Sequence, residues 1–150
     1  MQRLAKFIYF NLLGWQIIGN TSFSKDTIKK AVIIAVPHTS WHDFYIGVLL
    51  RAVVQVKTNC IGKKALFVFP FGYFFKALGG SPIKRKVNEN KVESSAKGYD
   101  EHEEFRMTLA PEGTRKRVEE WKTGFYYIAK KANVPIIMFT LDFENKRNTI

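Results

Sequence analysis

The feature that most constrains the fold of this chain is a series of apolar runs, each of which stops at a proline or a polar turn. The run AVIIAV covers residues 31–36 and stops at Pro37. Similar runs predict a second strand over residues 53–62, a third that starts at Phe105, and a final buried strand over residues 134–143. Continuous runs rich in β-branched residues are typical of strands that are buried on both faces of a parallel sheet.

Segments with a helical pattern separate these strands. Thr39 or Ser40 can cap a helix that runs to about Leu50. Apolar residues at helical spacing over 71–78 predict another helix, which either packs in the core or lines a groove for an acyl chain. Residues 119–134 also have a helical pattern. The alternation predicts the α/β class, with a mixed, mostly parallel sheet flanked by helices on both faces.

Length and composition bound the remaining possibilities. At 150 residues, the chain is long enough to bury a core without disulfides and is expected to form a single domain over residues 1–150. Its single cysteine, Cys60, excludes a disulfide within the chain and fits a reducing compartment. Lys and Arg number 24 against 13 Asp and Glu, which gives a net charge of +11. This excess indicates an anionic partner: nucleic acid, an acidic membrane surface or a phosphorylated substrate.

Residues 1–20 are rich in large apolar side chains, but polar residues such as Lys6 and Asn11 interrupt them. A membrane-spanning helix needs about 20 predominantly apolar residues, so this segment is not expected to span a bilayer. Its basic residues and Trp15 instead predict an amphipathic helix that lies in the membrane interface. The alternatives are a signal peptide and a helix that packs on its own domain. A helix that packs on its own domain is compatible with an interfacial role if one face packs on the domain and the other meets the membrane.

Two of the three histidines, His38 and His42, follow the first strand together with Asp43. A histidine at a strand end can fold back onto a carboxylate in the next helix, which leaves its other ring nitrogen free to take a proton. His38 and Asp43 are therefore a candidate base and its orienting carboxylate. The alternatives are an ordinary polar turn and a metal site, for which neither Cys60 nor His102 completes a ligand set. We expect no metal, and we expect His42 to be a packing or hydrogen-bonding residue.

A second polar constellation is APEGTRKR, residues 110–117. Gly113 permits a tight turn and a close approach of the backbone to a ligand. Thr114 offers a hydroxyl, and Arg115 offers a planar fork of donors that suits phosphate. Glu112 can hold that arginine or bind a hydroxyl of a substrate. An ordinary charged turn is the alternative.

The two constellations are expected to meet. In open α/β sheets, ligands gather at the carboxyl ends of the strands, and both His38 and the segment 110–117 follow the ends of predicted strands. A third basic group, Lys84 to Lys86, follows a Gly-Gly turn and can add a second anion contact through Arg85. A solvated basic loop is the alternative for this third group.

Read together, these segments resemble the glycerolphosphate and lysophospholipid acyltransferase family. The first family block, H-x4-D, is HTSWHD, and the second, a Gly-Lys start that runs to a basic residue, is residues 62–85. The third block, PEGTR, is residues 111–115, and the fourth, VPIIMF, is residues 134–139. The spacing of WKTG at residues 121–124 also fits. The fourth block departs from the family because it lacks a second proline after its apolar residues.

The resemblance implies that His38 is the general base that deprotonates the acceptor hydroxyl, and that Asp43 orients it and balances its charge. The hydroxyl oxygen would attack the thioester of acyl-CoA or of an acyl carrier protein, and the thiol would leave without an acyl-enzyme. The thioester is a co-substrate, and no cofactor is implied. The residues implied to bind the phosphate and glycerol portion of the acceptor are Glu112, Gly113, Thr114, Arg115 and Arg85.

The implied acceptor is a lysophospholipid, 1-acylglycerol-3-phosphate above all, whose acylation gives phosphatidate. Together with the basic, amphipathic N-terminus, this predicts a monotopic enzyme on the cytoplasmic face of an acidic membrane. The alternative is a non-catalytic basic domain that binds an anionic membrane or nucleic acid. We expect no nucleic-acid partner, because the aromatic residues lie in apolar runs and no known reader motif is present. The chain stops soon after the fourth block, so both a compact member and a truncated C-terminus are compatible with it.

Overall fold

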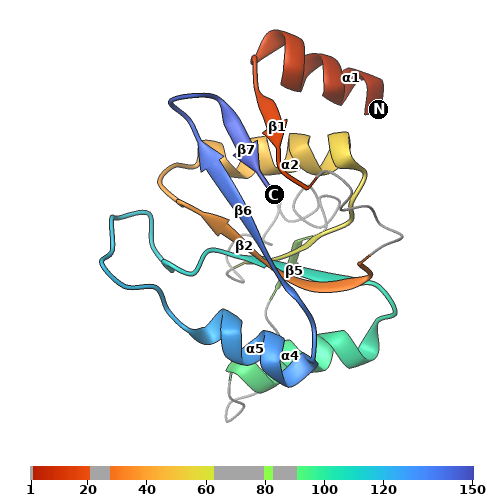
Figure 1. Cartoon of the computed structure of the whole chain (residues 1–150). Helices are drawn as coiled ribbons and strands as arrows, with labels where there is room; N and C mark the ends of the chain where they lie inside the picture. The colour runs from red at the N-terminus through yellow and green to blue at the C-terminus, as the bar shows by residue number, and fades with distance from the viewer. Residues whose placement is uncertain (1, 21–27, 63–79, 83–90) are drawn as a thin grey trace.

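The structure of the chain is a computed structural model that describes residues 2–20, 28–62, 80–82 and 91–150 (Figure 1). Its described helices lie in the N-terminal segment, after the second strand and on either side of the fifth. They are α1 (Gln2–Lys6), a π-helical turn η1 (Phe7–Leu12), α2 (His42–Val54), α4 (Lys91–Glu101) and α5 (Gly124–Ala132).

A mixed, mostly parallel sheet forms the centre of the molecule, as the sequence predicts. Its strands are β1 (Gln16–Ile18), β2 (Lys30–Val36), β3 (Asn59–Gly62), β4 (Gly80–Pro82), β5 (Phe105–Leu109), β6 (Ile136–Asp142) and β7 (Arg147–Thr149). Their order across the sheet is β1-β7-β6-β2-β5-β3-β4. All described neighbours are parallel except β6 and β7, which are antiparallel.

Strand β2 lies between β5 and β6 and divides the core into two halves. Because side chains alternate between the faces of a strand, Val32 and Ile34 pack into one hydrophobic cluster and Ile33 packs into the other. All three side chains are buried. The prediction of a strand that is buried on both faces is therefore confirmed for β2.

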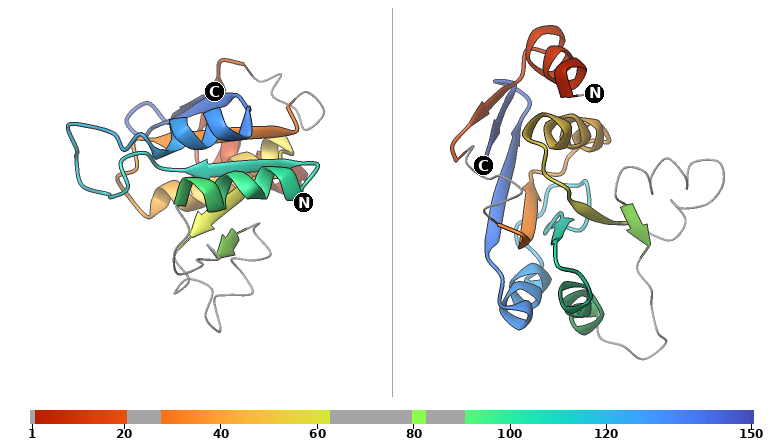
Figure 2. Two further views of the ribbon diagram at one scale, coloured as in Figure 1. Left: turned by 90° about the horizontal axis from the view of Figure 1, so that it is seen from below. Right: turned by 90° about the vertical axis from the view of Figure 1, so that its right-hand side faces the viewer.

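Each face of the sheet carries its own helical layer (Figure 2). The α1/α2 layer consists of α1, η1 and α2, and its buried residues Tyr9, Ile46 and Leu50 cluster with Phe139 of β6. The α4/α5 layer consists of α4 and α5, and it buries Tyr99 and Ile128 against β2 and β5. The two layers thus cover opposite faces, as expected for an α/β fold.

The N-terminal segment departs from the helix predicted over residues 1–20. Its helical part ends at Leu12, and Gly14 then adopts a φ of +70°, a left-handed conformation that commonly ends helices. The chain continues as β1, which pairs with β7. Strand pairing over such a long sequence separation leaves no local signal, which is why the helical pattern predicted too long an element.

The N-terminal segment is nonetheless fixed to the domain. The Tyr9 hydroxyl donates a hydrogen bond to Oδ1 of Asn148, and both residues are fully buried. Burial raises the pKa of Tyr9, so that its hydroxyl stays protonated and remains a donor. Trp15 is also buried, and its ring meets that of Phe143 edge to face. Among the described residues, no helix combines the length and the apolar composition that crossing a membrane requires.

The strand predicted over residues 53–62 is wrong in its first half. Helix α2 continues to Val54 and ends at Gln55, whose φ is 56°, and β3 begins only at Asn59. Ile46, Leu50 and Val53 are buried at helical spacing. Tertiary packing of this stripe outweighs the β-preference of the valines.

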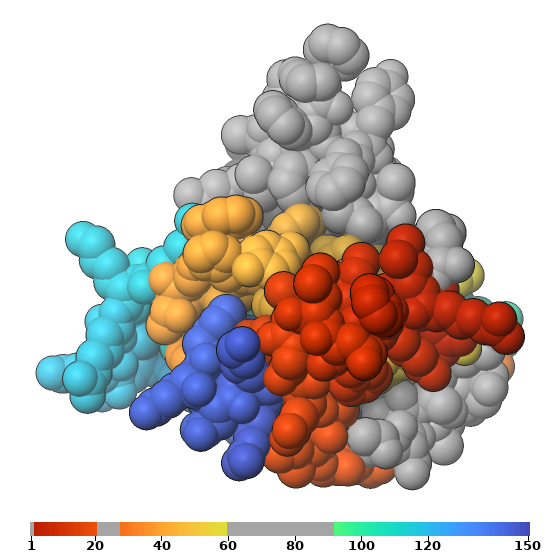
Figure 3. All heavy atoms as spheres, turned by 90° about the horizontal axis from the view of Figure 1, so that it is seen from above, coloured from red at the N-terminus to blue at the C-terminus, as the bar shows by residue number. Residues whose placement is uncertain are grey.

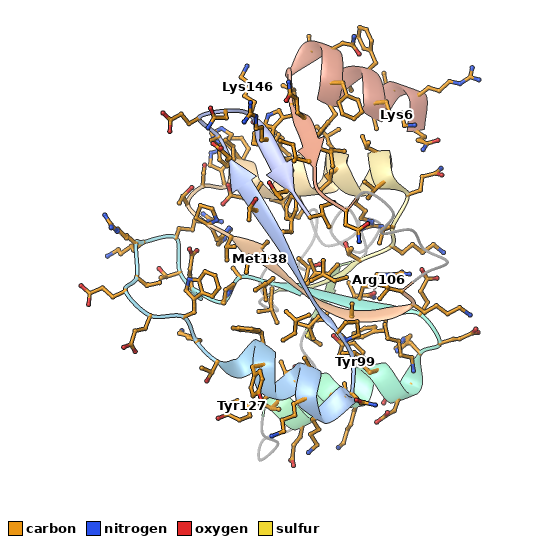
Figure 4. All side chains as sticks on the ribbon, viewed as in Figure 1. Lys6, Tyr99, Arg106, Tyr127, Met138 and Lys146 are labelled. Carbon is orange, nitrogen blue, oxygen red and sulfur yellow. The ribbon has the colours of Figure 1, made fainter. Side chains whose placement is uncertain are left out.

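Three smaller differences concern the second half of the chain and the start of α2. Helix α5 begins at Gly124, five residues later than predicted, and α2 begins at His42. Strand β6 is neither final nor buried throughout, because β7 follows it and Met138 is half exposed on one face (Figure 4). The helix predicted over residues 71–78 lies outside the described residues.

Candidate active site

The first part of the site lies where β2 gives way to α2. His38 follows the end of β2, and Asp43 is the second residue of α2. Nδ1 of His38 donates to Oδ2 of Asp43 at 2.9 Å. The Asp43 side chain is only 4% exposed, whereas that of His38 is 29% exposed. A buried carboxylate thus holds one ring nitrogen, and the partly exposed ring leaves its Nε2 for another partner.

The turn between these two residues supports the carboxylate. The backbone N–H of Ser40 donates to the same Oδ2 of Asp43 at 3.0 Å. The Ser40 hydroxyl lies 2.8 Å from Nδ1 of His42 and accepts the His42 backbone N–H at 3.2 Å. His42 therefore takes part in local hydrogen bonds, as expected. Within the described parts of the chain, no three potential ligands gather to form a metal site.

The second part of the site lies in the loop after β5. Strands β2 and β5 are parallel neighbours, and the loops that follow them leave the sheet on the same side (Figure 1). A carboxylate oxygen of Glu112 accepts the backbone N–H of His38 at 2.7 Å. The prediction that both constellations meet at one edge of the sheet is therefore confirmed. The contact also links Glu112 to the backbone of His38, a role that its predicted binding of substrate does not include.

Of the other residues of the PEGTR loop, Pro111 is buried, Thr114 is half-buried, and Gly113 and Arg115 are exposed. Gly113 has a φ of +65°, and its N–H donates to the carbonyl of Ala110. The Thr114 hydroxyl accepts the N–H of Lys116 at 3.2 Å. Arg115 is exposed, and no ion pair or hydrogen bond engages it within the described residues. Its guanidinium can therefore meet an anion from solvent. Arg85, the fifth predicted binding residue, lies outside the described residues.

Sequence reasoning gave no role to Lys122, which the fold brings to the same loop. Its backbone N–H donates to the carbonyl of Pro111 at 2.9 Å. Its side chain crosses Gly113 so closely that a Cβ at residue 113 would lie 2.7 Å from Nζ. Glycine at 113 thus provides both the left-handed backbone and the space for a second cation beside Arg115. The WKTG segment, which contains Lys122, was noted in the sequence. Its spacing could not predict that the Lys122 side chain lies over Gly113.

The arrangement combines an oriented histidine with a loop that carries two exposed cations. His38 is oriented by Asp43, and its backbone is held by Glu112. Two cationic side chains, Arg115 and Lys122, belong to the loop that supplies Glu112. Such a site can remove a proton from a hydroxyl group on a molecule that also carries a phosphate.

The comparisons with known proteins agree with this chemistry. The family model named Acyltransferase matches residues 16–141. A curated 1-acyl-sn-glycerol-3-phosphate acyltransferase of Haemophilus influenzae is 27% identical over 135 residues, which cover 85% of this chain and 54% of that protein. The chain thus spans about half the length of this relative. No solved structure matches the present chain. Since the family model covers most of the chain and includes both parts of the site, the chain belongs to the acyltransferase family.

Proposed function

We propose that the protein transfers an acyl group from a thioester to the hydroxyl of a lysophospholipid, and specifically that it converts 1-acylglycerol-3-phosphate to phosphatidate. The observation that carries this proposal is the His38–Asp43 pair, 2.9 Å apart, in contact with the PEGTR loop through Glu112. Membership of the acyltransferase family and the printed name of the Haemophilus relative support it. The donor would be acyl-CoA or an acyl carrier protein.

In the proposed mechanism, Nε2 of His38 takes the proton of the acceptor hydroxyl as the oxygen attacks the carbonyl carbon of the thioester. Asp43 stabilises the imidazolium that forms, because its buried carboxylate already accepts from Nδ1. The tetrahedral intermediate collapses, the C–S bond breaks, and the new ester forms. The imidazolium returns its proton to the departing thiolate, which restores the neutral base.

The phosphate of the acceptor would lie against Arg115 and Lys122. Arginine offers a planar fork that matches two phosphate oxygens, and lysine adds a mobile point charge. Both side chains are exposed and belong to the loop whose Glu112 contacts the backbone of His38. This placement would hold the glycerol hydroxyl near the base while the phosphate stays at the protein surface. Arg85, which the resemblance also implies, would be a further contact for the phosphate.

The direct test is to follow thiol release with a panel of acceptors and donors. The panel contains lysophosphatidate, glycerol 3-phosphate and lysophosphatidylcholine, each with acyl-CoA and with acyl carrier protein. We expect release with lysophosphatidate to exceed that with the other acceptors. Absence of release with every acceptor and donor would contradict the proposal.

Arg115→Ala tests the binding of the acceptor. Loss of a charge-assisted hydrogen bond costs about 1.5–3 kcal/mol, so we expect KM for lysophosphatidate to rise by about tenfold or more while kcat changes little. Lys130→Ala is the matched control, because Lys130 is an exposed cation in the last turn of α5. Equal KM values in the two variants would remove Arg115 from the acceptor site.

Gly113→Ala tests the close approach of Lys122. An alanine at a φ of +65° is strained by about 1–2 kcal/mol, and its methyl group would displace the Lys122 side chain. We expect a higher KM for lysophosphatidate. The effect of Lys122→Met should be smaller in this background than in the parent protein, because both changes remove the same cation. Strictly additive effects would show that the two residues act independently.

We also propose that the protein binds the cytoplasmic face of an acidic membrane through its N-terminal helix. One face of α1 and η1 packs on the domain through Ala5 and Tyr9, while Phe7 and Leu12 point outward and are 59% and 70% exposed. This division would let one face of the segment pack on the domain while the other meets lipid. Basic residues beside exposed apolar ones favour an anionic interface.

Deleting residues 1–20 would remove Tyr9, Trp15 and β1 from the packed domain, so point variants test this proposal better. Replacing Phe7 and Leu12 by serine should reduce co-sedimentation with phosphatidylglycerol vesicles without changing thermal stability. Tyr127→Ser, on the opposite layer, is the control because Tyr127 is also largely exposed (Figure 4). Unchanged sedimentation of the double variant would contradict an anchoring role.

A further inference from the structure

A group of large aromatic side chains at the start of α2 remains without a function in the proposed mechanism. Trp41, Phe44 and Tyr45 are exposed, and Trp41 is 63% exposed. Their spacing of three and four residues places them on one side of the first turn of the helix. The dyad residue Asp43 lies between them in sequence. We call these three residues the α2 aromatic cluster.

We propose that the α2 aromatic cluster is a second contact with the anionic bilayer, which holds the mouth of the His38–Asp43 site against the lipid surface. This inference rests on the membrane association and the lipid acceptor of the proposed function. It adds a surface that the N-terminal helix does not provide, at the edge of the sheet where the acceptor would enter.

The cluster is held in place by ring contacts. The Trp41 ring lies 4.3 Å from the ring of His42 and 5.7 Å from that of Tyr45, measured between centroids. His42 in turn lies 5.4 Å from Tyr45, and its Nδ1 is held by the Ser40 hydroxyl. The aromatic surface is therefore pre-formed. Tryptophan and tyrosine combine an apolar body with a polar tip, and for this reason they collect at membrane–water interfaces.

The cluster lies in the same layer as the exposed N-terminal residues. Helix α1 runs antiparallel to α2, with the Gln2 amide donating to the carbonyl of Val53 near the far end of α2. The end of η1, with Phe10 and Leu12 exposed, therefore points toward the start of α2. Viewed from above, residues 2–20 (red) and the start of α2 (orange to yellow) share one face of the molecule (Figure 3). A single lipid surface can meet both.

Charge identifies an anionic bilayer as the partner of this face. The first 25 residues contain no Asp or Glu, and Arg3 and Lys6 are exposed there. The acidic residue of α2, Asp43, is buried and paired with His38. The α4/α5 layer instead exposes charges of both signs, with carboxylates such as Glu93 beside cations such as Lys130 and Lys131. The exposed charges of α1 are basic alone, so an acidic surface is attracted most strongly to the α1/α2 layer.

The test uses the fluorescence of the three tryptophans. Vesicles of phosphatidylglycerol with brominated acyl chains quench only tryptophans that reach the acyl region. Trp15 is buried and provides a constant background, whereas Trp41 and Trp121 are both exposed. Trp121 is the matched control because it follows Glu119 and Glu120 in the loop before α5. Tryptophan fluorescence is measured for the wild type, Trp41→Phe and Trp121→Phe, each with and without the brominated vesicles.

We expect strong quenching in the wild type, loss of most of it in Trp41→Phe, and no loss in Trp121→Phe. Unchanged quenching in Trp41→Phe, in a protein that binds vesicles, would overturn the inference and leave the membrane association of the N-terminal helix standing. Failure of the wild type to bind vesicles would overturn both. Neither result would contradict the proposed acyl transfer, which can be measured separately with a water-soluble acceptor.

A second measurement separates lipid contact from a role in the chemistry. Trp41→Ala should lower turnover of lysophosphatidate embedded in vesicles, while turnover of a short-chain lysophosphatidate dissolved as monomers should stay at the wild-type level. Equal losses with both acceptors would overturn the inference, because Trp41 would then act on the reaction itself. Thermal unfolding of each variant should match that of the wild type, since the Trp41 side chain is largely exposed.

Discussion

The two helical layers of the molecule expose different chemistry. In the α4/α5 layer, Glu93 and Lys131 form an ion pair of 3.0 Å between the two helices, and the outer surface carries charges of both signs beside the exposed Tyr126 and Tyr127. In the α1/α2 layer, large apolar residues such as Leu4 and Leu12 face outward. The acid of α2, Asp43, is buried there in the pair with His38.

This difference indicates that the α1/α2 layer has the more apolar outer surface of the two. Exposed apolar side chains that lie singly are normal, but a contiguous set of them marks a surface for an apolar partner. Helix α2 belongs to that layer and also supplies Asp43, so the proposed lipid contacts and the proposed base are joined through one helix.

The largest expected effect is the difference in kcat/KM between variants of two histidines, His38 and His102. His38→Gln should lower kcat/KM by about 10²–10⁴-fold, because a positioned base is lost, while the glutamine amide can still donate to Asp43. His102→Gln should leave activity unchanged, because His102 is exposed at the end of the α4/α5 layer, where it bonds to the carbonyl of Gly98 and stacks on Phe105. Steady-state thiol release measures both. Similar activities in the two variants would break the assignment of the chemistry to the α1/α2 layer.

The next effect compares two buried tyrosines. The Tyr9 hydroxyl donates to Asn148, and that of Tyr99 donates to the carbonyl of Ala31 at 3.0 Å. Replacing Tyr9 by phenylalanine leaves Oδ1 of Asn148 buried and unpaired, at a cost of about 1–3 kcal/mol in the free energy of unfolding. Replacing Tyr99 removes one hydrogen bond from the Ala31 carbonyl, at a cost of about 0.5–1.5 kcal/mol. Urea unfolding should detect both losses.

The two tyrosine variants should differ in membrane binding. Tyr9→Phe weakens the attachment of η1 to β7, so it should also reduce binding to anionic vesicles, whereas Tyr99→Phe should not. Hydrogen exchange should locate the change at β1 and β7 in the first variant alone. If Tyr99→Phe reduces vesicle binding equally, loss of global stability rather than the N-terminal segment controls the binding.

Local patterns were sufficient to predict the centre of the site. AVIIAV has the residue types of a buried strand, and the five-residue separation of His38 and Asp43 lets one fold back on the other. The parallel sheet then implies that the PEGTR loop lies at the same edge, since β2 and β5 both run toward it. Each of these inferences depends on residues close in sequence or on a general rule of sheet topology.

Contacts between distant segments could not be predicted in the same way. Glu112 meets the backbone of His38 across 74 residues, and Tyr9 meets Asn148 across 139. The placement of Lys122 over Gly113 depends on the path of a loop rather than on periodicity. The end of α2 was missed for a related reason: Val53 and Val54 favour strands locally, and only packing of the helix on β6 and η1 decides their conformation.

The smallest expected effects come from replacing one exposed charge in each layer. Glu93→Gln breaks the half-exposed ion pair with Lys131, so it should lower stability by no more than about 1 kcal/mol, and added salt should abolish the difference. Lys6→Gln should not change stability, because Lys6 is exposed and has no acidic residue near it in sequence. It should instead weaken binding to phosphatidylglycerol vesicles by about 1 kcal/mol.

Thermal unfolding and vesicle sedimentation, measured on both variants, should therefore give opposite responses. The Glu93→Gln protein should lose stability and keep its vesicle binding, and the Lys6→Gln protein should lose vesicle binding and keep its stability. A Glu93→Gln protein that sediments more than the wild type would show that the anionic bilayer also meets the α4/α5 layer, and the division of the molecule into a water-facing and a lipid-facing side would fail.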